Sequence, residues 1–531
     1  MNKTGFIKGA FIATLCIIIT KIIGILYVIP FYSIIGEQGG ALYGYAYNIY
    51  NFFLIISSAG IPLAISKITS EYDTLKMHAE KKYMFSFVKK IIYSFSFISF
   101  GICFLGSDLI ANIIIGDMTG GNSAEDISYV IKCVSFALLI VPLLSILRGY
   151  MQGHKFISVP SISQIIEQVF RIAVILLGSY FAINVLNLSL TQAVGISVFG
   201  AFVGALFGYL YLLSKYKHIK IKEKTKKLNL EEKKVIRKKV IQYCIPFIAV
   251  NLSYTFYTTI DMILIIRTLN YLNFNANDIE AISSIFTTWG TKLIAIVTSI
   301  STGLIISLIP NMVAAYAEKN LKELNNLYQK TIEALLMIIL PISIFLSIHS
   351  SSVWNILYGH SDFGPIIFRY LGLLAFFEAF FIIIGSITQN LNKFKLVYLT
   401  IVIGLGLNTL LDVPLMLLFN YLNIYPYYGA ITATIIAYFI TIAIVVVKLK
   451  KDDNISFKFI KIKNYFLKTF LILIPVNYIG SLFINNFTNR IYSFIGLAII
   501  SFISSIIYVI INYKLINDRL GKNLFDIVLR K

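Results

Sequence analysis

Charged side chains are scarce in this sequence. Asp, Glu, Lys and Arg together supply only 13% of its 531 residues, about half of their usual share in soluble domains. The longest polar stretch, residues 215–240, is too short to fold alone, so a separate soluble domain is also excluded. Apolar residues predominate instead, with 58% hydrophobic residues and a mean hydropathy of +0.80. These values indicate a polytopic membrane protein.

Cysteine and histidine are also rare, with four and five residues respectively. The cysteines lie in or beside apolar stretches, and the sequence contains no CxxC motif or Cys/His cluster. We therefore expect neither a zinc site nor a disulfide framework. No Ser/His/Asp arrangement and no pair of catalytic carboxylates is evident from the spacing. We expect a protein that is not an enzyme and that has no resident cofactor.

Fourteen apolar stretches are long enough, or nearly so, to cross a bilayer as helices of about 20 residues. They cover approximately residues 6–33, 41–66, 90–115, 127–150, 160–184, 190–214, 241–269, 281–311, 328–352, 364–388, 396–419, 428–449, 464–484 and 490–513. A β-barrel is excluded because its strands would appear as alternating segments of about ten residues. The first stretch is longer than a signal-peptide core and lacks a small-residue cleavage site, so we expect it to be retained. The predicted fold class is an all-α polytopic membrane protein with about 14 transmembrane helices.

The net charge of +21 is distributed unevenly along the chain. Loops on one side of the predicted spans hold most of the lysines and arginines, including the run "SKYKHIKIKEKTKKLNLEEKKVIRKK". Loops on the other side have Arg490 as their one basic residue, and their acidic residues are Glu37, Asp117, Glu125, Asp126, Asp278, Glu280 and Asp362. This asymmetry predicts that both termini and the basic loops face the cytoplasm. It favours a role in topology and attraction to anionic lipids over nucleic-acid binding.

The long basic loop divides the first twelve spans into two groups of six. The predicted parts are an N-terminal lobe at 1–214, a basic cytoplasmic loop at 215–240, a second lobe at 241–449, and two further helices with a cytoplasmic tail at 450–531. Two groups with the same orientation are typical of parallel repeats. "RGYMQGHKF" and "GSITQNLNKF", about 237 residues apart, are consistent with such a repeat.

Ionisable residues inside the spans are costly to insert, so each one is expected to face a cavity or a partner. The candidates are Lys21, Glu167, Arg171, Asp261, Arg267, Lys292, Glu333, Arg369, Glu378 and Asp412. Glu167 and Arg171 are four residues apart, which favours a structural ion pair over a substrate contact. Lys21 and Lys292 lie deep and have either a substrate or a local carboxylate as partner. Pro30 and the following "IIGEQGG" predict a kink of the kind that a gate needs.

One further polar group lies in "LGLNTLLDVPLM", where Asn408 and Asp412 are one helical turn apart. Together with Asp261 they would supply two carboxylates and an amide oxygen, which are ligands suited to Na⁺ or a proton. Thr434 in "YYGAITATIIAY" would add a hydroxyl group. The alternative is that these side chains form hydrogen bonds between helices.

Several motifs resemble a known family. The stretches "TKIIGILYVIPFYSIIGEQGGALYGYAY", "AGIPLAISK" and "RGYMQGHKFISVPSISQIIEQVFRI" are similar to the polysaccharide-biosynthesis and lipid-flippase branch of the multidrug/oligosaccharidyl-lipid/polysaccharide exporter superfamily. Within it the chain is most similar to the YtgP-type MurJ group of Gram-positive bacteria, and next to the SpoVB group. The resemblance runs through essentially all fourteen spans. It implies two six-helix lobes around a central cavity and two more helices that form a lipid-facing groove. It also implies export of lipid II from the inner to the outer leaflet of the cytoplasmic membrane.

The resemblance also implies where the substrate binds. In that family, basic residues of the first, second and eighth helices bind pyrophosphate, and Lys21 and Lys292 stand at two of these positions. The sequence departs from the family because Tyr27 and Val28 replace an Arg-Asp pair, and the second-helix arginines are apolar within "NFFLII". Other basic residues are then expected to substitute, and the candidates are Arg148 and Arg171.

For the coupling ion, the resemblance implies a Na⁺ site made by Asp261, Asn408, Asp412, the backbone carbonyl of Ala430, and Thr434. Cell-wall synthesis proteins are candidate partners besides the lipid-linked glycan and the membrane lipids. Three alternatives remain: a flippase for another undecaprenyl-linked polysaccharide, a MATE-like multidrug/cation antiporter, and a membrane scaffold for a cell-wall synthase. The lysines at 21 and 292 argue against the antiporter, which would need acidic groups for cationic drugs.

Overall fold

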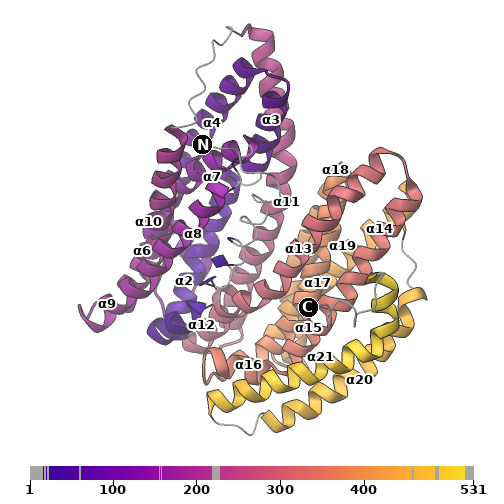
Figure 1. The fold of residues 1–531 in the computed structure, drawn as a ribbon. Helices are drawn as coiled ribbons and strands as arrows, with labels where there is room; N and C mark the ends of the chain where they lie inside the picture. Colours follow the sequence, from indigo (N-terminus) through magenta and orange to yellow (C-terminus); the bar gives the residue numbers. More distant parts are fainter. Residues whose placement is uncertain are drawn as a thin grey trace. The chain divides into compact units, whose positions relative to one another are not determined.

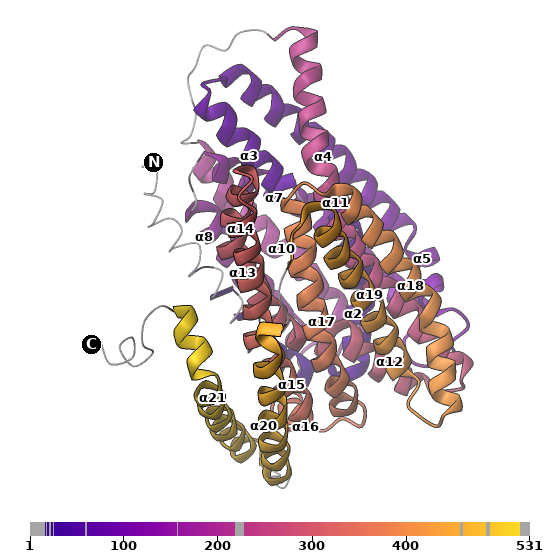
Figure 2. The same ribbon diagram turned by 90° about the vertical axis from the view of Figure 1, so that its right-hand side faces the viewer.

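The computed structural model describes residues 16–520, apart from 17–18, 21–22, 25, 59–60, 155, 157, 218–227, 457–459 and 485–488. The described part is almost entirely helical and contains no strand, which confirms the predicted fold class (Figure 1). The chain forms two compact units. Unit 1 contains Met1–Thr291 and Thr409–Leu417, and unit 2 contains Lys292–Asn408 and Leu418–Lys531. Figure 2 gives a second view of the same helices.

Unit 1 is built mainly from the first half of the chain, where η denotes a π-helical segment. Its elements are α2 (Val28–Ser58), α3 (Ile61–Thr74), α4 (His78–Leu105), α5 (Ser107–Ile115), α6 (Ala124–Ser135), α7 (Ala137–Gly153), α8 (Ser158–Ala173), η1 (Val174–Gly178), α9 (Ser179–Asn184), α10 (Leu190–Tyr216), α11 (Leu230–Tyr271), α12 (Ala276–Ser284) and η3 (Ile285–Trp289).

Unit 2 is built from the second half. Its elements are α13 (Gly290–Ala317), α14 (Leu321–Ala334), η4 (Leu335–Ile339), α15 (Leu340–Ile348), α16 (Ser350–Leu357), α17 (Gly364–Asn390), α18 (Phe394–Tyr421), α19 (Tyr427–Asp453), α20 (Ile460–Ile484) and α21 (Arg490–Leu520). The middle of α18 belongs to unit 1.

Ten helices in the described part of the chain are long and apolar enough to cross a membrane. They correspond to the predicted spans other than the first, second, seventh and thirteenth. The first span lies partly outside the described residues and ends in α2. The second lies on α2 and α3, the seventh on α11 and the thirteenth on α20. A multi-pass membrane protein is therefore confirmed.

The predicted break in the first part of the chain is present at Gly36. Its backbone has φ 63° and ψ −161°, a conformation accessible essentially to glycine alone. The break divides α2 into two helical stretches, so the first two predicted spans meet without a longer loop. The kink expected from "IIGEQGG" thus lies at its first glycine.

Helix α11 extends the seventh predicted span toward the basic loop. It begins at Leu230 because Asn229 caps it: the Asn229 side chain accepts the Glu232 N–H at 2.7 Å, and Glu232 accepts the Asn229 N–H at 2.8 Å. The first turns of α11 pack into a core of unit 1 with α3, α4 and α7, through side chains that include Ile236 and Val240. Unit 1 thus contains α11, α12 and η3 in addition to the helices of the first predicted lobe.

In the described part of the chain, three π-helical segments interrupt the long helices, and each lies within a few residues of an ionisable side chain. Segment η1 follows Arg171 on α8, η3 precedes Lys292 on α13, and η4 follows Glu333 on α14. π-Helical turns are rare and occur frequently at functional sites. Their positions therefore mark these side chains as candidates for a functional role.

Candidate functional site

The first part of the candidate site is built where α8 packs against α10. Glycines spaced four residues apart on α10 allow the two backbones to approach. A Cβ atom at Gly204 would lie 2.5 Å from the Glu167 carbonyl oxygen, and one at Gly200 would lie 3.0 Å from the Arg171 carbonyl oxygen. Small residues permit such close packing between membrane helices. Close packing against α10 therefore positions the α8 backbone at Glu167 and Arg171.

The side chains of Glu167 and Arg171 form an arginine cluster with Arg148 on α7. Glu167 pairs with Arg171 Nη2 at 2.5 Å and with Arg148 Nη1 at 2.8 Å. Arg148 also donates to the Ser163 hydroxyl at 2.9 Å, and Arg171 donates to the Tyr47 hydroxyl at 3.4 Å. The three charged side chains are only 12–17% exposed. The arginine cluster, defined as Arg148, Glu167 and Arg171, thus joins α7, α8 and α2.

The arginine cluster carries a net positive charge because two guanidinium groups share one carboxylate. The neighbouring side chains on α2 are the stacked rings of Tyr43 and Tyr47, whose centroids are 5.2 Å apart, and they add no negative charge. The Nε atom of Arg171 is buried and has no hydrogen-bond partner among the described residues. An unbalanced charge at low exposure is unfavourable until it meets a counter-charge. The arrangement is suited to an anionic ligand.

These contacts test one of the two interpretations of the "EQVFR" sequence, the ion pair. The structural ion pair between Glu167 and Arg171 is confirmed. Arg148 was, like Arg171, a candidate substitute for the missing arginines, and the structure brings it to the same carboxylate as Arg171. Spacing along the chain gives no signal for this contact, since Arg148 lies on a different helix. Its part in substrate binding remains a prediction, as does that of Arg171.

The two predicted lysines differ in what is known of their surroundings. Lys21 lies outside the described residues. Gly24, one turn later, is close to α8, since a Cβ atom there would lie 3.5 Å from Gln168 Nε2. Lys292 is half-buried near the start of α13, directly after η3. Their roles as pyrophosphate ligands stay predictions.

The second part of the candidate site is the acidic pair, defined as Asp261 on α11 and Asp412 on α18. Asp412 has no exposed surface, and neither of its carboxylate oxygens has a hydrogen-bond partner among the described residues. The Asp261 side chain faces it closely enough for the two carboxyl groups to interact. Asn408 lies one turn before Asp412 and is also fully buried. The two predicted acidic ligands are therefore neighbours.

The remaining predicted ligands lie on α19 in unit 2. Thr434 and Ala430 are buried, and the Thr434 hydroxyl donates to the Ala430 carbonyl at 3.1 Å. No group of three or more His, Cys, Asp or Glu side chains able to hold a metal ion occurs in the part of the chain that the structure describes. Carboxyl oxygens are hard ligands that suit Na⁺ and do not suit a soft transition metal, and the five-residue Na⁺ site stays a prediction. A cation at Asp412 would meet its orphaned oxygens.

A groove in unit 2 matches the lipid-facing groove implied by the resemblance. Helices α20 and α21, yellow in Figure 1, run side by side and enclose a concave apolar surface. A Cβ atom at Gly480 would lie 2.6 Å from Ile500, so the glycine permits the helices to approach. The lining residues include Val476, Ile479, Phe483, Ile499 and Ile503. Such a surface suits an aliphatic chain.

Comparisons with known proteins identify the family of the chain. Residues 6–272 match the family described as polysaccharide biosynthesis protein. The chain is 31% identical over 471 residues to the lipid II flippase MurJ of Bacillus subtilis (strain 168), covering 85% of this chain and 84% of that protein.

Two solved structures have a similar fold. A lipid II flippase MurJ in an inward closed conformation is similar with a TM-score of 0.65, 14% identity, and coverage of 95% of this chain and 100% of that one. A multidrug-resistance MATE family transporter in an inward-facing conformation is similar with a TM-score of 0.61 and 14% identity, covering 82% of this chain and 96% of that one.

Proposed function

Because the chain belongs to the polysaccharide biosynthesis protein family, and within it to the MurJ group of flippases, we propose that it moves lipid II across the cytoplasmic membrane. Lipid II is an undecaprenyl-pyrophosphate carrying a disaccharide-pentapeptide. The proposed process is alternating access without any bond made or broken. The observation that carries the proposal within the molecule is the net positive charge of the arginine cluster.

The substrate has two parts that need different surroundings, and the chain offers both. The arginine cluster supplies guanidinium groups, whose planar forks match phosphate oxygens in pairs. We infer that Arg148 and Arg171 act with Lys21 and Lys292 on the pyrophosphate. The apolar groove between α20 and α21 accommodates the polyprenyl tail while the headgroup crosses.

The acidic pair is the proposed coupling site. A cation held by Asp261, Asn408 and Asp412, with Ala430 and Thr434 as further ligands, biases the cycle if it binds one conformation more tightly than the other. Na⁺ is the proposed ion, and a proton shared by the two carboxyl groups is the alternative. The orphaned oxygens of Asp412 support either choice.

The proposed orientation follows from the charges. Both termini and the basic loops face the cytoplasm, and the acidic loops face outward. The proposed setting is a Gram-positive cytoplasmic membrane, where cell-wall synthesis proteins are candidate partners. The second candidate function is transport of another undecaprenyl-linked glycan, because the pyrophosphate that the basic residues would bind is common to both substrates.

The test is a flipping assay in vesicles that contain the full-length protein. Labelled lipid II in the inner leaflet is expected to reach the outer leaflet faster with the protein than without it, and faster still with a Na⁺ gradient. An undecaprenyl-pyrophosphate glycan of different sugar composition serves as the competing substrate. Lys21→Ala and Lys292→Ala are expected to slow the transfer. If only the competing glycan is transferred, that glycan and not lipid II is the substrate. If neither is transferred, the proposed flippase function is wrong.

A further inference from the structure

A buried acid that the proposed transport cycle does not use lies on α12. The Glu280 side chain is 1% exposed, although the sequence places it among the acidic residues outside the membrane. One carboxylate oxygen accepts the backbone N–H of Asn122, and the other has no hydrogen-bond partner among the described residues. A buried carboxyl group with an unused oxygen calls for a physical explanation.

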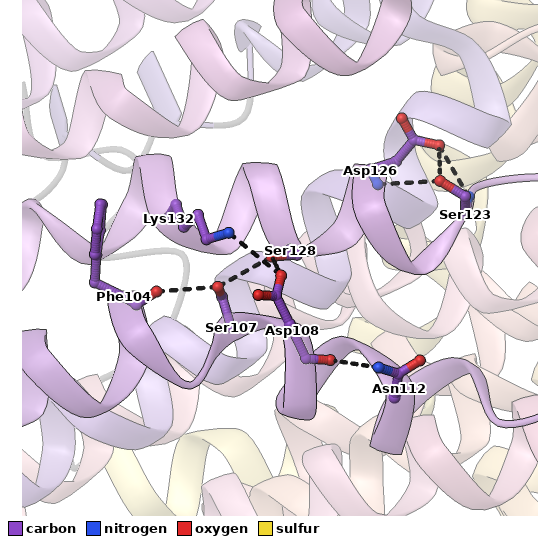
Figure 3. A network of polar contacts seen from close by, with 8 residues as sticks. All are labelled: Phe104, Ser107, Asp108, Asn112, Ser123, Asp126, Ser128 and Lys132. Atoms are coloured by element: carbon purple, nitrogen blue, oxygen red, sulfur yellow. Dashed lines mark hydrogen bonds and ion pairs between the residues drawn. The ribbon is translucent and has the colours of Figure 1, made fainter.

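The loop before α6, which contains Asn122, leaves space for the Glu280 carboxyl group. Ser123 caps α6 by accepting the Asp126 N–H at 3.1 Å, and Asp126 accepts the Ser123 N–H at 2.9 Å (Figure 3). Before the cap, Gly121 has φ +67°, and a Cβ atom there would lie 2.6 Å from Glu280 Oε1. The capping box fixes the loop, and the glycine leaves room for the carboxyl group next to Asn122.

The same loop is fixed from a second side. The Asn122 side chain donates to the Gln38 carbonyl of α2 at 3.1 Å. Figure 3 also shows how α5 is tied to α6: Asp108 on α5 accepts from Lys132 at 3.3 Å and from the Ser128 hydroxyl. The loop that contacts Glu280 is therefore fixed to α2, and the helix that follows it is fixed to α5, all within unit 1.

The segment after Glu280 sits in a groove of α2. Gly40 and Gly44 are four residues apart, and a Cβ atom at Gly40 would overlap the Trp289 ring while one at Gly44 would overlap Thr287. The Thr288 hydroxyl donates to the Gly40 carbonyl at 2.9 Å, and Trp289 has no exposed surface. The π-helical segment η3 thus packs directly against the α2 backbone.

These contacts join two parts of the chain that the sequence assigns to different lobes. Helices α2 and α6 belong to the predicted first lobe, and α12 with η3 belongs to the second, yet all of them lie in unit 1. They meet at the end that the acidic loops place outside the cell. An alternating-access carrier, which is the proposed function, has to separate these contacts in order to open outward, and that is the role of an extracellular gate.

We propose that Glu280 is a proton-sensitive latch on this gate. In its neutral form the carboxyl group stays seated against Asn122. When it loses its proton, the charge leaves the buried position for water and the gate opens.

The charges around Glu280 support this assignment. Asp126 on α6 is a like charge that acts on Glu280, Tyr45 on α2 is a neutral phenol beside it, and Asp278 is a second acid on its own helix. Arg267 on α11 donates to a backbone carbonyl of α5 at 2.7 Å. No lysine, arginine or histidine among the described residues forms an ion pair with Glu280. Burial and a nearby like charge both disfavour a carboxylate there.

The test measures how easily a thiol behind the gate is reached from outside. Ser283→Cys, one turn from Glu280 and 2% exposed, is placed in the full-length protein without its four native cysteines. The protein is reconstituted in vesicles, and a membrane-impermeant thiosulfonate is added. Asp362→Cys, whose native side chain is 82% exposed, corrects for the reagent's own pH dependence. Relative to this control, labelling is expected to rise about tenfold between about pH 6 and about pH 8.

Glu280→Gln is the decisive variant, because its amide oxygen accepts the same N–H and cannot ionise. Its labelling is expected to stay low at both pH values. An unchanged pH dependence in this variant, or none beyond the control in the parent, would overturn the latch.

A second variant tests the gate itself. Gly40→Ala prevents Trp289 from seating, so Ser283→Cys is expected to react fast at every pH. Its matched control is Gly101→Ala on α4, where a Cβ atom meets nothing within 4 Å. Slow labelling in Gly40→Ala would show that these contacts do not close the gate.

Discussion

The arginine cluster and the acidic pair both lie in unit 1, and their charges are unbalanced in opposite senses. In the cluster, two guanidinium groups share the Glu167 carboxylate, so a positive charge remains. In the pair, Asp412 turns two orphaned oxygens toward a second carboxyl group. Burial makes either imbalance unfavourable. The difference is one of charge: the arginine cluster is suited to an anion and the acidic pair to a cation, and the proposed coupled export of a phosphorylated lipid would use both.

Among these variants, removal of the Arg171 side chain is expected to have the largest effect, which is a loss of affinity for lipid II. Arg171→Ala leaves Arg148 and Glu167 as a neutral pair, so the headgroup loses its nearest unbalanced charge. A hydrogen bond to a charged group contributes about 1.5 to 3 kcal/mol. Each 1.4 kcal/mol is about tenfold in affinity, so the apparent affinity for lipid II in the flipping assay should fall by about ten- to 100-fold.

The matched control for Arg171→Ala is Arg369→Ala, an exposed arginine on α17. It removes one positive charge from the chain without touching the arginine cluster. Equal losses in both variants would mean that net charge alone, and not the cluster, attracts the substrate.

Neutralising the acidic pair is expected to have an intermediate effect. Asp412→Asn keeps the shape of the side chain and removes the charge that a cation would balance. Flipping without a Na⁺ gradient should stay within about twofold of the parent, while its stimulation by Na⁺ should fall by about tenfold, corresponding to roughly 1.4 kcal/mol of coupling. The measurement is the flipping rate at two Na⁺ concentrations.

The exposed Asp362 provides the control for the acidic pair, through Asp362→Asn. That variant should keep the full Na⁺ stimulation. If Asp412→Asn keeps its Na⁺ stimulation, Asp412 is excluded from coupling. If the parent protein shows no Na⁺ stimulation and its flipping rate depends on pH instead, the coupling ion is a proton.

The sequence predicts those features of these regions that depend on local spacing. Hydropathy identifies the helical spans, glycine at position 36 locates the break in α2, and the i, i+4 spacing predicts the Glu167–Arg171 pair. In each case the interacting groups are close along the chain. The same holds for Asn408 and Asp412, which share one helical face.

Contacts between helices could not be predicted from the sequence because they depend on how the helices pack. Arg148 reaches Glu167 only because the glycines of α10 bring α8 into place, and nothing near Arg148 in the chain indicates this. Glu280 reads as a loop residue, yet Gly121 and the capped start of α6 bury it. The signal available in the sequence was a glycine beside a polar loop residue, and such a pair occurs in many other loops.

The smallest expected effect is that of Tyr47→Phe, which distinguishes the contribution of the arginine cluster from that of the tyrosines beside it. Tyr47→Phe removes a long hydrogen bond of 3.4 Å to Arg171 and keeps the ring stacked on Tyr43. A net contribution of about 0.5 to 1 kcal/mol predicts an affinity for lipid II that is about two- to fivefold lower. Tyr47→Leu, which removes the ring as well, should lose more, and both should lose less than Arg171→Ala. A loss in Tyr47→Phe as large as that of Arg171→Ala would mean that the phenol itself contacts the headgroup, and the anion-binding region would then extend from α8 onto α2.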